Sequence, residues 1–150
     1  MSMFNPDTFL DQETVAANDT SIIPCPVGDY PLTIVKLKPR PWAKRDDPTV
    51  NGVALDVTFE VNDEEVKVTC QRDKVTVKMG VMLDMTDDGK LDEGKGKNVA
   101  LGRLREAVSL NNPGEKFSFN MLLGRMLMGR ITHRADGEDI FPEVKAVTKL

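Results

Sequence analysis

The chain has 150 residues, of which 40% are hydrophobic and 29% are charged, so it has the size and composition of one globular domain with a substantial core. Its net charge of −4 argues against binding to nucleic acid through overall charge alone. No apolar run approaches the ~20 residues of a membrane-spanning helix, and the first ten residues lack the pattern of a signal peptide. We therefore expect a cytoplasmic protein with no membrane partner.

Residues 1–27 are predicted to form an arm outside the domain, which then comprises residues 28–150. The arm contains three prolines, and the first 29 residues carry five acidic side chains without one Lys or Arg. We expect at most one short helical turn in the arm, around Asp11–Ala17. Cys25 and Cys70 lack the spacing of a metal or redox motif, so both are expected to be reduced, partly buried thiols. The sequence does not argue for a disulfide between them.

A basic stretch follows the start of the predicted domain. The first strand is expected over Tyr30–Lys38, and the proline-rich residues 39–51 are expected to form a long loop. The segment Val35–Arg45 spans the strand end and the loop, and it holds five basic residues, no acidic residue and the only tryptophan, Trp42. Cations that follow phosphates and a ring on which a base stacks are what single-stranded nucleic acid requires. The alternative is a solvated strand end with Trp42 packed back onto the core, because charge runs of this kind usually face solvent.

Two more strands are expected between residues 53 and 81. Residues 53–61 alternate strictly between apolar and polar side chains, which predicts a half-buried strand. After a turn at Asn62-Asp63 the alternation continues over residues 66–70, which predicts a hairpin partner, and it resumes over residues 75–81. The break at Gln71–Asp73 is either a bulge in one long strand or a turn between two strands.

The polar residues 84–97 are expected to form a loop without a cofactor or metal. Their acidic residues resemble a calcium-binding EF-hand loop, but Lys95 stands where that loop needs a bidentate Glu. The spacing of Gly89, Gly94 and Lys95 resembles a phosphate-binding loop, but no Ser or Thr follows. The single histidine, His133, has no partner at ligand or catalytic spacing. We therefore predict no metal site, no catalytic residues and no enzyme activity.

The remaining third of the chain is expected to hold helices followed by a hairpin. The predicted elements are a helix over Val99–Leu110 with Asn98 as its N-cap, a short helix over Ser118–Leu123, strands over residues 125–134 and 140–148, and a turn at residues 135–138. The order of strand, long loop, hairpin, helix and hairpin is the order of an OB-fold. The predicted fold is therefore mainly β, an OB-fold-like five-stranded barrel with a helix between strands three and four.

This fold and the basic stretch indicate the same binding site. An OB-fold binds its ligand on strands two and three, between the loops that join strands one to two and four to five. Here those loops are residues 39–51, which contain Trp42, and residues 135–138. The agreement favours binding of single-stranded nucleic acid at this place.

The candidate binding residues are two rings and a set of basic side chains. Trp42 is the expected stacking platform, and Tyr30 stands second because a tyrosine at a strand start is either a platform or a core edge. The remaining phenylalanines considered, Phe59, Phe117, Phe119 and Phe141, are expected in the core. The cations expected to contact phosphates are Lys36, Lys38, Arg40, Lys44, Arg45, Lys67, Arg72, Lys74, Lys78, Arg130 and Arg134, with Arg125 as a further candidate. Each is also compatible with an ordinary solvated side chain, and Asp56 and Glu60 would repel phosphate on the second strand.

Four stretches of the chain carry a family resemblance. They are P-V-G-D-Y-P-L-T-I-V at residues 26–35, L-D-V-T-F-E-V at residues 55–61, L-G-R-L-R-E-A-V at residues 101–108, and M-L-L-G-R-M-L-M-G-R-I-T-H-R at residues 121–134 closed by V-K-A-V at residues 144–147. Over about residues 22–150 the chain resembles the small bacteriophage OB-fold proteins of the single-stranded DNA-binding family. The resemblance rests on small, apolar and basic residues, not on a catalytic signature. One departure is the ending V-T-K-L, where single-strand binders often carry an acidic tail that recruits partners.

The resemblance implies a role in coating single strands during phage DNA replication or recombination in the host cytoplasm. We therefore expect a non-enzymatic protein that binds single-stranded DNA, or RNA, without sequence specificity, and self-association stays open. The alternative is a phage structural or protein-interaction barrel that does not bind nucleic acid. The acidic arm and the low aromatic content of 5% favour that alternative.

Overall fold

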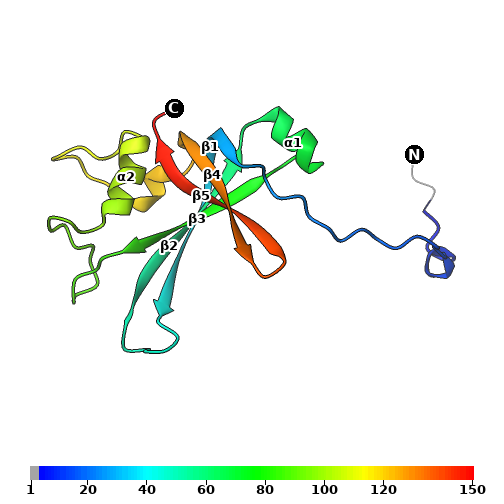
Figure 1. The fold of residues 1–150 in the computed structure, drawn as a ribbon, viewed down its shortest axis with the longest axis horizontal. Coiled ribbons are helices and arrows are strands. Elements are labelled where there is room, and N and C mark those ends of the chain that lie inside the picture. The colour runs from blue at the N-terminus through cyan, green and yellow to red at the C-terminus, as the bar shows by residue number, and fades with distance from the viewer. Residues whose placement is uncertain (1–3) are drawn as a thin grey trace.

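The structure is a computed structural model in which residues 4–150 are described. Its strands form a closed barrel in the order β1-β2-β3-β5-β4, with the parallel pair β3 and β5 beside otherwise antiparallel neighbours (Figure 1). The elements in chain order are η1 (Phe9–Asp11), β1 (Gly28–Ala43), β2 (Asn51–Val61), α1 (Glu64–Cys70), β3 (Thr76–Leu83), α2 (Val99–Ala107), η2 (Phe119–Leu122), β4 (Met126–Asp136) and β5 (Asp139–Thr148). The predicted five-stranded OB-like barrel is confirmed, and α2 lies between β3 and β4 in the chain as expected.

The barrel interior is filled by alternate side chains of the strands. On β2 the inward residues Leu55, Val57, Phe59 and Val61 are all buried, as the strict alternation predicts. The apolar stripe of α2 packs against this core and closes one end of the barrel. Each buried side chain of this size stabilises the fold by about 1.5–3 kcal/mol. The core therefore fixes the barrel and leaves the opposite face of each strand for other contacts.

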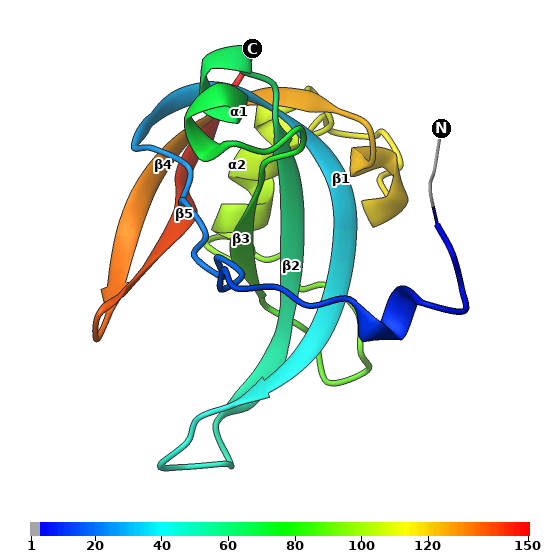
Figure 2. The same ribbon diagram turned by 90° about the vertical axis from the view of Figure 1, so that its right-hand side faces the viewer.

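β1 is longer than predicted, because it continues through two prolines to Ala43. Pro39 pairs in register with Leu55 and Pro41 with Val53. From Lys36 onward β1 is paired in register with β2 alone, so one edge of the strand is free and can accommodate residues that lack an N–H donor. The predicted long loop is therefore a short one, residues 44–50, at the tip of a hairpin that projects from the barrel (Figure 2).

A β-bulge in β1 changes which side chains face the interior. The register with β2 shifts between Ile34 and Lys36. Before the bulge Leu32 and Ile34 point into the barrel and are fully buried, whereas after it Leu37 packs against the core and Lys36 is exposed. A one-residue insertion exchanges the two faces of a strand, so the basic half of β1 faces solvent.

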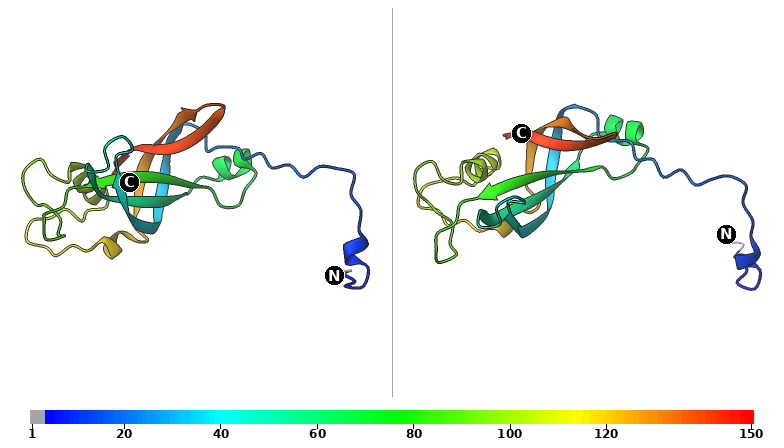
Figure 3. Two further views of the ribbon diagram at one scale, coloured as in Figure 1. Left: turned by 90° about the horizontal axis from the view of Figure 1, so that it is seen from below. Right: turned by 60° about the horizontal axis from the view of Figure 1, so that its bottom comes forward.

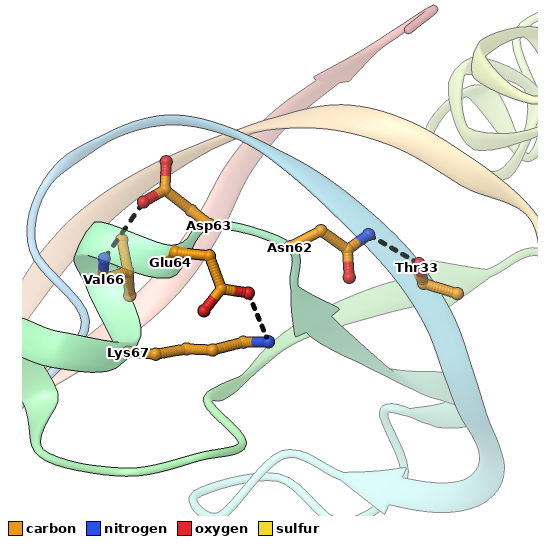
Figure 4. A network of polar contacts seen from close by, with 6 residues as sticks. All are labelled: Thr33, Asn62, Asp63, Glu64, Val66 and Lys67. Atoms are coloured by element: carbon orange, nitrogen blue, oxygen red, sulfur yellow. Dashed lines mark hydrogen bonds and ion pairs between the residues drawn. The ribbon is translucent and has the colours of Figure 1, made fainter.

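The strand predicted over residues 66–70 is wrong, because this segment is the helix α1. The Asp63 side chain accepts a hydrogen bond from the backbone N–H of Val66 at 3.0 Å and thus caps the helix, as Figure 4 shows. Val66 and Cys70 are buried, while Val68 faces solvent. α1 ends at Gln71, whose φ of 56° is left-handed, so the break expected as a bulge or turn is a helix terminus. β3 is correspondingly short.

Asn98 stands at the N-cap position of α2, as predicted, but its side chain does not cap the helix. Instead its amide accepts from the N–H of Asp84 at 2.8 Å and donates to the carbonyls of Asp84 and Asp92. It thereby joins the two ends of the expected loop over residues 84–97. α2 ends at Ala107, three residues before the predicted Leu110.

The arm leaves the barrel through a short anchored segment, residues 23–26, which we call the arm root. Cys25 is 1% exposed, its carbonyl lies 2.7 Å from His133 Nε2, and Arg72 donates to the carbonyl of Ile23 at 2.8 Å. Burial raises the pKa of the Cys25 thiol to about 11, so the thiol is neutral and poorly reactive near neutral pH. Cys70 is also buried, and both cysteines are free, as expected.

Beyond the arm root, residues 4–22 are exposed and extend away from the barrel (Figures 1 and 3). The short turn in this part is η1, Phe9–Asp11, and not the predicted turn around residues 11–17. The first three residues of the predicted arm lie outside the described residues. Within residues 4–150, neither helix has the length and apolar character needed to cross a membrane.

Gly129 tests how tightly the barrel is packed. A Cβ at this position would overlap the Cδ1 methyl of Leu32, which is fully buried and has little room to move. Gly80, on the outer surface of β3, would place a Cβ 3.9 Å from Asp56 Oδ1, which is an ordinary contact. We expect Gly129→Ala to lower the free energy of unfolding by about 1–3 kcal/mol through overpacking. Denaturant unfolding measures this.

Gly80→Ala is the matched control for that substitution. It introduces the same methyl group in the same sheet, and we expect the free energy of unfolding to change by less than about 0.5 kcal/mol. Equal effects at the two positions would contradict the close approach of β4 to β1 inside the barrel.

Candidate nucleic-acid interface

The bulge places a row of predicted binding residues on one surface, formed by the outward side chains of β1, β2 and β3. On β1 these are Lys36, Lys38, Arg40 and Trp42; opposite them in register lie Thr58, Asp56, Ala54 and Gly52 of β2, and then Lys78, Gly80 and Met82 of β3. We call this set the outer face. The β3 members are exposed and the β2 members are more buried, so the β2 members lie between two more prominent edges.

Three lysines on the outer face form no ion pair within residues 4–150, although Lys38 lies opposite Asp56 and Lys78 opposite Glu143 in register. Lys36 and Lys78 flank Thr58 in one register row, and Lys38 lies in the next row. The three lysines are exposed and converge from two strands, so they can contact an anion without first breaking an ion pair within the protein.

The two acidic side chains on β2, Asp56 and Glu60, differ in their position and in their partners. Asp56 accepts from Arg40 Nε at 2.7 Å, so the phosphate repulsion expected from Asp56 is offset by the guanidinium beside it. An exposed pair of this kind contributes at most about 1 kcal/mol of stability, and it occupies Arg40. Glu60 pairs in register with Thr76 and lies at the opposite end of the outer face from Trp42. The outer face is thus most basic between these two ends.

Trp42 lies against Gly52 across the β1–β2 pair. A Cβ on Gly52 would be 2.9 Å from Trp42 Nε1 and 3.1 Å from two other ring atoms. The indole N–H is buried there and has no hydrogen-bond partner. Gly52 lies within β2 and provides the space that the ring occupies. One side of the indole is therefore fixed, which holds Trp42 at the base of the 44–50 loop.

The loop itself carries charges of both signs. Lys44 and Arg45 are followed directly by Asp46 and Asp47. Lys44 N–H donates to the carbonyl of Val50 at 2.8 Å, which closes the loop. These two predicted cations are adjacent to the outer face, but their acidic neighbours reduce the local positive potential.

The predicted cations around α1 are not part of the outer face. Lys67 pairs with Glu64 at 3.3 Å on the same helix (Figure 4). Arg72 holds the arm root, as described above, and its buried Nε has no hydrogen-bond partner. Lys74 lies in the exposed segment before β3. In this group, Arg72 therefore anchors the arm and Lys67 lies on the surface of α1.

Two further candidates lie on the β1–β4 side of the barrel. Arg130 is opposite Asp29 in register and bonds it at 3.0 Å, and this carboxylate raises the pKa of the guanidinium. Tyr30 shares the inward side of β1 with Leu32 and packs against the core. Of the two roles left open for Tyr30, the structure places it at the core edge. Arg125 donates from Nε to the carbonyl of Met121 at 3.4 Å.

Phe141 was predicted to be in the core, and this is wrong. It is 41% exposed on the outer surface of β5, and the Arg134 guanidinium lies 5.4 Å from its ring centroid. Arg134 also pairs with Glu143 at 3.6 Å. The alternation of β5 in the sequence could have predicted this exposure. Phe141 lies on the same side of the strand as Glu143 and Lys145, whereas Val144 points inward. Phe59 is in the core as predicted, and Phe117 and Phe119 pack against it.

A pocket of about 740 Å³ extends the outer face toward Phe141. Thr76, the outward residue of β3 beyond Lys78, lines it together with Arg72, Ile22 and Phe141. The β3–β5 pairing of Lys78 with Glu143 brings the start of β5 beside this part of β3. Glu138 and Asp139 also line this pocket, so Phe141 lies beside acidic side chains at the β5 end of the surface, whereas Trp42 and the unpaired lysines lie on β1 and β3.

Comparison with models of known protein families found no match, and comparison with curated proteins found none. The chemistry of the site therefore has to be argued from its own residues. Within residues 4–150, no three His, Cys, Asp or Glu side chains are grouped closely enough to hold a metal ion. The outer face presents cations and one aromatic ring, Trp42, which are the groups suited to electrostatic attraction of an anion and to stacking.

The position of Trp42 depends on Gly52, and this can be measured by fluorescence. We expect Gly52→Ala to push the indole away from β2, because the new methyl group would lie within 2.9 Å of Nε1. Trp42 is the only tryptophan, so the emission maximum should shift to longer wavelength as the ring becomes more exposed. Gly80→Ala on the same face is the control and should leave the emission unchanged. An unshifted spectrum in Gly52→Ala would show that the ring does not rest on Gly52.

Proposed function

We propose that the chain is a bacteriophage single-stranded DNA-binding protein that acts without sequence specificity and without enzyme activity in DNA replication or recombination in the host cytoplasm. One observation carries the proposal. The bulge between Ile34 and Lys36 aligns Lys36, Lys38 and Trp42 on the same outer surface as Lys78 of β3. These four come from two separate segments of the chain, and they supply the charge and the ring that a single strand needs.

The proposed mechanism assigns separate tasks to cations and rings. Lys36, Lys38 and Lys78 contact consecutive phosphates, and each contact releases counterions. Trp42 and Phe141 offer ring faces to bases, with stacking worth on the order of 1–3 kcal/mol for each base. Every base has a π-face, so this mode selects no sequence. RNA offers the same phosphates and bases, so oligo-U is the second ligand to test.

The phosphate contacts predict the salt dependence of binding. In a titration of fluorescent oligo-dT, we expect affinity to fall as salt rises, with a slope near −0.7 for each phosphate contacted on a log–log plot. Lys36→Gln and Lys78→Gln should each make that slope shallower by about 0.7. Lys116→Gln is the matched control, because Lys116 is exposed in the segment after α2 and should leave the slope unchanged. Absence of binding at low salt would overturn the proposed function.

The two rings are tested by substitution at Phe141 and Trp42. Phe141→Ala and Trp42→Ala should each weaken oligo-dT binding by about 1–3 kcal/mol without changing the salt slope, because stacking involves no counterion release. Phe141→Tyr keeps the ring and should bind as the unchanged chain does. If Phe141→Ala retains full affinity, the strand does not reach β5 and the site ends at β3.

A second candidate function has one observation in its favour. The arm exposes Phe9 and Leu10 to solvent together with Asp7 and Asp11, a combination that is typical of a segment that docks on another protein. In this alternative the barrel is a structural or protein-interaction module. The same titration separates the two, because this alternative predicts no salt-dependent binding of oligo-dT.

A further inference from the structure

The arm combines negative charge with exposed apolar side chains. Its part beyond the root, residues 4–22, contains four acidic residues and no Lys or Arg. The apolar side chains on it are solvent-exposed, with Phe9 at 52% and Leu10 at 91%. Flexible linkers are often rich in Gly and Ser. This arm contains no glycine and exposes apolar side chains, which distinguishes it from such a linker.

The tip of the arm has local structure that presents these groups together. The rings of Phe4 and Phe9 meet edge to face at a centroid distance of 5.1 Å. The Asn5 side chain accepts from the N–H of Asp7 at 3.0 Å, and η1 follows at Phe9–Asp11. The tip is thus a small apolar cluster flanked by Asp7 and Asp11, a preformed shape that loses less entropy on docking than a disordered segment.

The outer face has the complementary properties. Lys36, Lys38 and Lys78 form no ion pair within residues 4–150. The same face carries Met82, which is 50% exposed, and the half-buried Trp42. The tip is acidic and the outer face is basic, and both also expose apolar side chains. This complementarity favours their association and steers their encounter.

The direction of the arm favours a second copy over its own barrel as the acceptor. The arm root is fixed by the burial of Cys25 and by the hydrogen bond from Arg72 to the Ile23 carbonyl. Beyond it the arm runs away from the barrel, and its tip lies far from β1 and β3 of the same chain in each view (Figures 1 and 3). We propose that the acidic arm of one copy docks on the outer face of a second copy.

This contact joins two different surfaces, so it is heterologous and leaves one arm and one face free at the ends of each assembly. Copies can therefore add in a row or close into a ring. The inference requires only that the outer face is basic, and it does not depend on whether the face binds DNA. If the face does bind DNA, the arm and the strand compete for the same lysines.

The test exchanges charges between the two surfaces in the full chain. The arm variant carries Asp7→Lys, Asp11→Lys and Glu13→Lys, and the face variant carries Lys36→Glu, Lys38→Glu and Lys78→Glu. All six side chains are exposed, and circular dichroism and thermal unfolding check that both variants fold. Sedimentation velocity at low salt then measures association without DNA.

We expect the unchanged chain to exceed its monomer mass of 16.6 kDa as concentration rises, and to return to it at high salt. Each variant alone should associate about tenfold or more weakly, because its arm and face then carry the same charge. An equimolar mixture should associate again, since the acidic arm of the face variant meets the basic face of the arm variant. The basic arm of the arm variant and the acidic face of the face variant also attract each other, so the mixture should form rows or rings in which the two variants alternate.

Two results would overturn the proposal. The unchanged chain can stay monomeric at all concentrations, or the mixture can fail to associate while the unchanged chain does. Failure of the proposed function is separate, because loss of oligo-dT binding leaves the mass measurements unaffected.

Discussion

The bulge between Ile34 and Lys36 is the constraint on which the outer face depends. Alternate residues of a regular strand face the same side, and here such a set is Leu32, Ile34, Lys36 and Lys38. A regular strand that buries Leu32 and Ile34 would therefore also turn both lysines into the barrel. Burial of an unpaired ammonium group costs several kcal/mol. The inserted residue removes that conflict, because it lets Leu37 continue the core while the lysines reach solvent. Core packing and the outer face are therefore two consequences of one irregularity.

The length of β1 leaves part of the strand with an unpaired edge, and its prolines protect that edge. From Lys36 onward its register is with β2 alone, so the hairpin has a free edge to which another strand could pair. Pro39 and Pro41 lack N–H donors, and prolines on an edge prevent such pairing. The projecting hairpin is thus open to ligands that contact its side chains, and closed to strand addition. The prolines that suggested a loop in the sequence are better explained by this edge.

The barrel could be predicted from the sequence because the clearest alternating patterns belong to the strands whose apolar residues form the core. The period-two pattern of β2 and the final hairpin specify the strand order, since their inward residues are the buried ones. The helix α1 was missed because Val66 and Cys70 are four residues apart, a spacing that both a helix and a strand place on one face. Asp63 followed by two glutamates was the better indicator, because it marks a helix N-terminus. The bulge has no such marker, so no pattern could tell which basic residues share a surface. The pairing of Arg130 with Asp29, 101 positions apart, likewise exists only in the folded chain.

The net charge of −4 conceals a separation of charge that matters more than its sum. The acidic tip of the arm lies away from the barrel that carries the unpaired lysines of the outer face (Figure 1). Each group of charges is screened beyond about 10 Å at 0.1 M salt. A single strand carries one charge for every nucleotide, whereas the arm carries four over residues 7–19. A dense polyanion therefore displaces the arm from the lysines, while sparsely charged anions do not. An acidic arm on a basic face would in this way restrict binding to polyelectrolytes, a selectivity that neither the overall charge nor the barrel alone provides.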